Sequence, residues 1–135
     1  MTVYKELGFV AVQFHDDDAV PELNDPSAAQ IRQRAQGVHQ RLEDLLEYDP
    51  HVRIAIEPKP NEPMDLAYIP TMVHGLALGF QTNDSKRVGV LMESVHAILV
   101  GLDPSDEIAF AMSSGTLMSV HLNDQNGLKY DREEL

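Results

Sequence analysis

Hydrophobic residues recur along the chain in two rhythms, one typical of strands and the other of helices. Short β-branched or aromatic runs, each followed by polar residues, predict strands at 9–14, 52–57, 88–92 and 117–122. Apolar residues at helical spacing predict helices from Pro26 to just before Asp49, from Thr71 to about Phe80 and from about Ser105 to Ser113. Because strands and helices alternate, the pattern predicts an α/β fold with parallel strands.

Length and composition narrow the class of protein. The 135 residues fit a single domain, 1–135, with 43% hydrophobic residues to build a core, but they are too few for a complete (β/α)8 barrel of roughly 250 residues. The net charge of −12 repels the phosphates of nucleic acids and anionic membranes, so neither is an expected partner. The absence of Cys excludes thiolate catalysis and zinc fingers. With neither a signal peptide nor a membrane-length apolar run evident, we expect a cytoplasmic protein.

Polar residues with ligand or catalytic chemistry follow the predicted strands, where α/β folds place their sites. Glu57 and Lys59 are two residues apart and share one side of an extended backbone, as a cation site beside an ammonium group or as a surface ion pair. Glu93 and His96 are three residues apart, a spacing that suits one shared ion on a helical turn but also a solvated or capping pair.

The ends of the chain add further donors. His121 and Asn123 share one side of the last predicted strand, and Asp131 and Glu133 follow two residues apart. Oxygen and nitrogen donors without sulfur favour Mg²⁺, Mn²⁺ or Co²⁺ over structural zinc.

After the first predicted strand, His15 precedes Asp18 by three residues. A carboxylate at that spacing can fix the tautomer of an imidazole for proton transfer. The alternative is that this acidic cluster caps a loop or a helix.

Four motifs together resemble the xylose isomerase family, which are metal-dependent (β/α)8 aldose-ketose isomerases. They are F-H-D-D-D at 14–18, I-E-P-K-P-N-E-P at 56–63, the Glu93-x-x-His96 pair and H-L-N-D-Q-N-G-L-K-Y-D at 121–131. The motifs occur in the family's order and touch nearly the whole chain. The resemblance implies a partial TIM-barrel fragment with about four parallel strands, similar to barrel strands 2, 5, 6 and 7.

The same resemblance implies a role for each matching residue. His15 looks like the histidine that assists sugar ring opening, Asp18 like the aspartate that orients it, and Lys59 like the lysine that contacts a substrate oxygen. The implied metal ligands are Glu57, Glu93, His96, His121, Asp131 and Glu133. A complete site would hold two divalent ions, Mg²⁺ or Mn²⁺ with Co²⁺ as an alternative, and would interconvert an aldose and a ketose of the D-xylose type.

The sequence also departs from the family in ways that leave alternatives open. His121 stands where xylose isomerases typically have an Asp. A His at this position is similar to the rhamnose isomerase branch, so the identity of the sugar is left open. Near residues 45–49 the chain lacks roughly a hundred residues that carry strands and substrate walls in a barrel of about 250, and the family's first and last strands are missing. We therefore expect copies of the chain to associate and supply the missing walls to one another, with a small sugar as the substrate. The alternatives are an inactive deletion fragment that keeps at most metal binding or self-association, and an unrelated acidic α/β binding domain.

Overall fold

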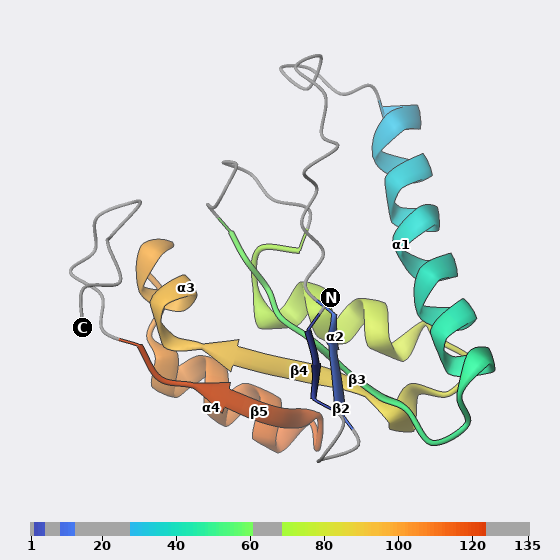
Figure 1. Ribbon diagram of the computed structural model, residues 1–135. Helices are drawn as coiled ribbons and strands as arrows, with labels where there is room; N and C mark the ends of the chain where they lie inside the picture. The colour runs from blue at the N-terminus through green and yellow to red at the C-terminus, as the bar shows by residue number, and fades with distance from the viewer. Residues whose placement is uncertain (1, 5–8, 13–27, 61–68, 124–135) are drawn as a thin grey trace.

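Five strands form one sheet in the computed structural model, which describes residues 2–4, 9–12, 28–60 and 69–123, with side chains from residue 36 onward (Figure 1). They are β1 Thr2–Tyr4, β2 Phe9–Val12, β3 Arg53–Ile56, β4 Val88–Glu93 and β5 Leu117–His121. The strands β2, β3, β4 and β5 run parallel, whereas β1 is antiparallel to β2. The four predicted parallel strands are confirmed, and β1 is an addition that the sequence pattern did not predict.

Helices connect the parallel strands along the chain. They are α1 Ala28–Tyr48, α2 Met72–Phe80, the 3-10 helix η2 Ser85–Arg87, α3 Ser94–Leu99 and α4 Pro104–Ser113. The three predicted helices are confirmed to within about two residues, but η2 and α3 are too short to show a helical period. No helix among the described residues is both long and apolar enough to cross a membrane.

The order of the strands identifies the architecture. Strands are adjacent in space in the order in which they follow one another in the chain, with no reversal such as a doubly wound sheet shows. Parallel crossovers of one hand then place their helices on the same face of the sheet, and α2 and α4 lie along it in Figure 1. Successive parallel strands with helices on the outside are the building plan of a TIM barrel.

The hydrophobic core lies between the sheet and these helices. One cluster joins the carboxyl-terminal half of α1 to β3, including Leu42, Leu46, Ile54 and Ile56. A second joins α2, β4 and α4, and consists of Met72, Leu76, Val90, Met92 and Ala111, with Ile108 and Leu117 packed against it. Alternate strand residues therefore face the helices, and the residues between them face the opposite side.

Two glycines let α2 approach the sheet closely. A Cβ on Gly75 would lie 3.0 Å from Cγ1 of Val90, and a Cβ on Gly79 would lie 3.2 Å from Cγ1 of Val88. Both are tighter than ordinary van der Waals contact, so larger residues would push the helix away. The spacing of four residues puts both glycines on the helix face that meets β4.

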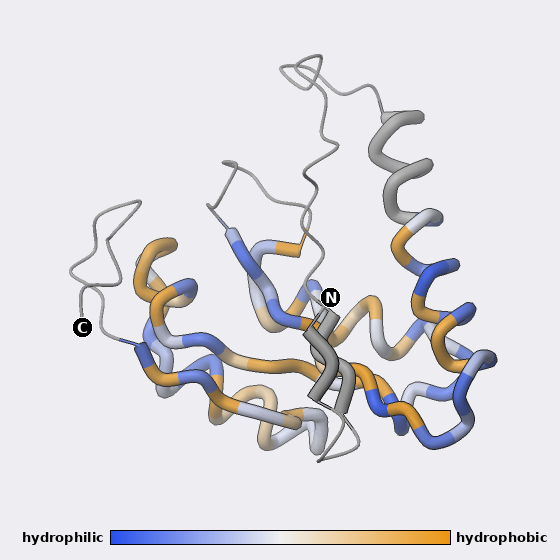
Figure 2. Tube along the Cα trace, viewed as in Figure 1, coloured by the Kyte–Doolittle hydropathy of each residue, from blue (hydrophilic) through white to orange (hydrophobic). Residues whose placement is uncertain are grey.

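The central strands are buried on both faces. Ala55 and Leu91 point away from the helices, yet each is only 2% exposed. Figure 2 shows the hydrophobic middle of β4 giving way to hydrophilic residues at its carboxyl end. The middle of the sheet is therefore apolar and buried, and the polar side chains lie where the strands end.

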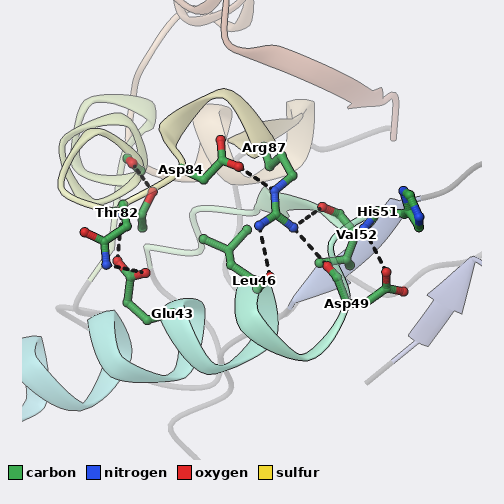
Figure 3. Close-up of polar contacts among 10 residues, drawn as sticks. Glu43, Leu46, Asp49, His51, Val52, Thr82, Asp84 and Arg87 are labelled. Carbon is green, nitrogen blue, oxygen red and sulfur yellow. Dashed lines mark hydrogen bonds and ion pairs between the residues drawn. The ribbon is translucent and has the colours of Figure 1, made fainter.

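At the other end of the strands, Arg87 fastens α1 to the sheet (Figure 3). Its guanidinium donates to the carbonyls of Leu46 at 2.9 Å, Asp49 at 2.9 Å and Val52 at 3.3 Å. Its Nε also donates to the Asp84 carboxylate at 2.7 Å. A cation at the carboxyl end of a helix satisfies carbonyls that have no intrahelical partner and complements the helix dipole.

We expect Arg87→Ala to lower the free energy of unfolding by about 2–3 kcal/mol, because it removes a charged donor from the partly buried carbonyls of Leu46 and Val52. Urea unfolding followed by circular dichroism measures the loss. The matched control is Lys86→Ala at the exposed neighbouring position, which should stay within about 0.5 kcal/mol of the parent. Equal urea midpoints for the two variants would show that Arg87 does not hold α1 in place.

Candidate metal centre

Three potential metal ligands meet at the carboxyl ends of three neighbouring parallel strands. Glu57 directly follows β3, Glu93 is the last residue of β4, and His121 is the last residue of β5. One ligand atom from each lies within 4.8 Å of the other two. Among the described residues, this group has the composition and spacing of a divalent-metal site.

Strand register explains the convergence. Glu93 and His121 are paired residues of β4 and β5, so their side chains leave the same face of the sheet. Ile56 and Met92 belong to the core clusters on the helix side, so Glu57 and Glu93, one residue further along, point to the opposite side. His121 Nδ1 lies 3.9 Å from Glu93 Oε2.

His96 lies beside the two carboxylates, on the turn of α3 that begins directly after β4. Its Nε2 is 3.3 Å from Glu57 Oε1 and 3.5 Å from Glu93 Oε2. The predicted Glu93 and His96 pair is therefore in ion-pair range, on the helical turn that the spacing suggested. His96 is not one of the three residues of the ligand group, whose imidazole comes from His121.

Asn123 and Ser94 hold the Glu93 carboxylate in place. Asn123 was predicted only as a further donor beside His121, and no role was predicted for Ser94. The Asn123 side chain donates to Glu93 Oε1. The Ser94 hydroxyl donates to the Asn123 carbonyl and accepts from the Asn123 backbone N–H, both at 2.9 Å. The available sequence signal was the shared side of His121 and Asn123, which places Asn123 at the same strand end.

Burial and a like charge dominate the electrostatics of the group. Burial raises the pKa of Glu93 to about 8, with further increases from a hydrogen bond to Glu57 and from the Glu57 charge. The Asn123 hydrogen bond and the positive charge of Lys59 oppose this rise in pKa. Two neighbouring carboxylates repel each other when both are ionised, and a bound cation would offset this repulsion.

The donor set fits a hard or borderline divalent cation. Two carboxylates and one imidazole suit Mg²⁺, Mn²⁺ or Co²⁺, whereas structural zinc sites are mostly built with thiolates. His121 is 42% exposed at its side chain, whereas Glu57 is 2% exposed. The group therefore has a buried side and an open side, and a small molecule can approach from the open one.

We expect the metal-free protein to lose stability as the pH rises from about 4.5 to about 8. The folded state keeps a proton on Glu93 up to a pKa of about 8, whereas the unfolded chain releases it near 4.5, so unfolding releases a proton within this window and rising pH favours it. Urea midpoints measured in EDTA between pH 5.5 and 8.5 test the slope. Glu93→Gln should flatten it, and Mn²⁺ should stabilise the parent most at the alkaline end, because metal ligands must be deprotonated. Identical slopes for parent and variant would contradict the prediction.

Of the remaining predicted site residues, only Lys59 lies in the described part of the chain. Lys59 is half-buried after β3, and its charge reaches Glu93, in keeping with the predicted proximity of Glu57 and Lys59. His15, Asp18, Asp131 and Glu133 lie outside the described residues, so their roles remain predictions.

A groove of about 810 Å³ lies elsewhere, between α1 and α2. None of the three ligand residues lines it. Its lining residues are Gln36, His39, Gln40, Ile69, His74, Ala77, Leu78 and Gln81. The candidate metal centre and this groove are therefore separate features.

Comparison with known proteins supports the architecture. No protein-family model matches the sequence. The structure is similar to the apo crystal structure of a 3-keto-D-glucoside 4-epimerase from E. coli, with a TM-score of 0.56 and 16% sequence identity over 78% of this chain. The match spans only 38% of the epimerase. The likeness concerns the fold alone, and it confirms the predicted partial TIM-barrel-like fragment.

Proposed function

We propose that the chain carries the metal centre of a divalent-metal-dependent sugar isomerase that interconverts an aldose and a ketose. The observation that carries this proposal is the convergence of Glu57, Glu93 and His121 at the ends of β3, β4 and β5. The sequence resemblance supports it, and so does the likeness of the fold to a sugar-converting enzyme. The full activity would also need residues outside the described part of the chain and walls that enclose the substrate.

The chemistry of such a reaction fits the residues present. An aldose-ketose conversion moves hydrogen between adjacent carbons and develops charge on two neighbouring oxygens. A divalent cation supplies electrostatic stabilisation of such oxygens. Glu57, Glu93 and His121 would hold the cation, and Lys59 would add positive charge beside a substrate oxygen. Asn123 would keep the Glu93 carboxylate oriented.

A native mass spectrum of the purified chain, with and without Mn²⁺, is the first test. One or two ions bound per chain would support the metal centre, and the loss of binding in His121→Gln would locate it. Xylose-type sugars should then raise the melting temperature only when Mn²⁺ is present, because a ligand stabilises only the state that binds it. Absence of specific Mn²⁺ binding would favour the inactive deletion fragment.

A sugar epimerase is the second candidate, favoured by the solved structure with the similar fold. Both reactions can use a cation and a proton or hydride shift at a carbon next to a carbonyl. NMR of the products distinguishes them, because an isomerase moves the carbonyl carbon and an epimerase inverts one stereocentre. Incubation with Mn²⁺ of a 3-keto-glucoside in parallel with a free aldose makes the comparison direct.

We also propose that copies of the chain associate. Within the described residues β5 pairs only with β4, so its other edge has no strand partner there. Four apolar side chains in this part of the chain are exposed, namely Val120 on β5, Leu122 just after it, and Phe110 and Met112 on α4. An unpaired apolar strand edge favours pairing with another chain. The same mass spectrum reports the number of subunits, and a strictly monomeric chain would contradict this proposal.

A further inference from the structure

His96 is the most buried imidazole near the candidate metal centre, and the three-ligand group does not use it. The residue is 5% exposed, and its Nε2 lies within 3.5 Å of an oxygen of both Glu57 and Glu93. Its other ring nitrogen, Nδ1, is buried and has no hydrogen-bond partner among the described residues. A buried polar side chain in this position needs a physical role.

The placement of the two imidazoles separates their roles. His96 and His121 both lie near Glu93 Oε2, at 3.5 Å and 3.9 Å. The side chain of His96 is 7% exposed, whereas that of His121 is 42% exposed. His121 therefore stands on the side that solvent and substrate reach, and His96 stands on the side that packs against the protein.

The surroundings of His96 also suit a support rather than an open coordination position. It lines a cavity of about 10 Å³ together with Thr71, Leu102 and Glu107, which is room for about one water molecule. The Glu107 carboxylate there accepts from the Met72 backbone N–H at 3.1 Å, which ties α4 to the start of α2. Glu93 lines this cavity too, so His96 and Glu93 are enclosed together by the start of α2, the loop before α4, and α4 itself.

We propose that His96 is a positioning residue, whose Nε2–H lies at ion-pair distance from Glu57 and Glu93 and draws both carboxylates toward His121, while His121 supplies the imidazole ligand. The proposal rests on the proposed metal centre and adds a division of labour between its two histidines. Groups that hydrogen-bond to metal ligands orient them and raise metal affinity, typically by about 10–100-fold. The neutral imidazole with its proton on Nε2 is the tautomer that performs this role.

Two substitutions separate support from coordination. His96→Gln keeps an N–H donor near the position of Nε2, and His96→Leu keeps the bulk without a donor. We expect Mn²⁺ affinity to fall about 10–100-fold in His96→Leu and only a few-fold in His96→Gln, measured by titration of the free-Mn²⁺ electron paramagnetic resonance signal. The rescue by Gln reflects the restored donor, which a purely space-filling role would not require.

Pulsed electron paramagnetic resonance of the bound Mn²⁺ gives the second readout, because it detects imidazole nitrogens bonded to the ion. We expect one such nitrogen in the parent and its retention in His96→Gln. Two nitrogens in the parent, or the loss of one in His96→Gln, would overturn the proposal and make His96 a ligand. Failure of the parent to bind Mn²⁺ in the titration would instead overturn the proposed metal centre itself. Circular dichroism shows whether each variant folds. If His96→Leu does not fold, the electron paramagnetic resonance spectrum of the parent still tests the proposal.

Discussion

Glu93→Gln should abolish specific Mn²⁺ binding while leaving the protein folded. The carboxylate lies between the other two members of the group, close enough to His121 and Glu57 to share an ion with both. An amide of the same shape supplies a neutral oxygen in place of a charged one, so two of the three donors remain but half of the negative charge of the two carboxylates is lost. Because even indirect partners of metal ligands contribute about 10–100-fold to affinity, the loss of a direct ligand should exceed 100-fold.

The fold should survive this change because Gln removes an electrostatic cost of the metal-free state. Burial and the Glu57 charge disfavour ionised Glu93, and a Gln oxygen can still accept from the Asn123 side chain. At pH 8 the urea midpoint of metal-free Glu93→Gln should therefore equal or exceed that of the parent. Isothermal titration with Mn²⁺ measures the binding.

Glu47→Gln is the matched control, since it makes the same chemical change at an exposed position of α1. It should bind Mn²⁺ as the parent does. If Glu93→Gln bound Mn²⁺ with parental affinity, the three-residue group would not be the metal centre. The proposal of metal-dependent turnover at this site would then be wrong as well.

The fold could be predicted from the sequence wherever a run was long or strongly patterned. The 21 residues of α1 and the apolar runs of β3 and β4 were recognisable, because burial on one or both faces imposes a period. The three residues of β1 carry no such period, and their antiparallel pairing depends on a neighbouring strand. Short elements are set by tertiary contacts that a local pattern does not contain.

The candidate site was predictable in its members but not in its geometry. The positions of Glu57, Glu93 and His121 at strand ends indicated that they would meet, since parallel strands deliver their carboxyl ends to one edge of the sheet. Which imidazole shares the ligand group depends on the register of β5 against β4. A shift in that register beside Val90 and Leu91 is invisible in the sequence, as is the reach of Asn123 back to Glu93.

That register depends on close contact between β4 and β5 at Gly89, so we expect Gly89→Ala to destabilise the sheet and disturb the metal centre together. An added Cβ would run into the Thr116 carbonyl oxygen and lie 2.8 Å from Cγ of Met118. Met118 can rotate away, but the carbonyl is part of the backbone and accepts from the Val90 N–H at 3.0 Å. Overpacking typically costs 1–3 kcal/mol, and a backbone clash places Gly89→Ala at about 3 kcal/mol.

Gly37→Ala on α1 is the matched control, because nothing lies within 4 Å of the added Cβ. In the interior of a helix this change should stabilise the protein by about 0.5–1 kcal/mol. Urea unfolding should therefore shift in opposite directions for the two Gly→Ala variants.

Gly89→Ala should also weaken Mn²⁺ binding, because β5 carries His121 and moves when its contact with β4 opens. Adding Met118→Ala should recover little of the loss, since the backbone clash remains. Parental stability in Gly89→Ala would mean that β5 does not approach β4 so closely, and the pairing of Glu93 with His121 would lose its structural basis.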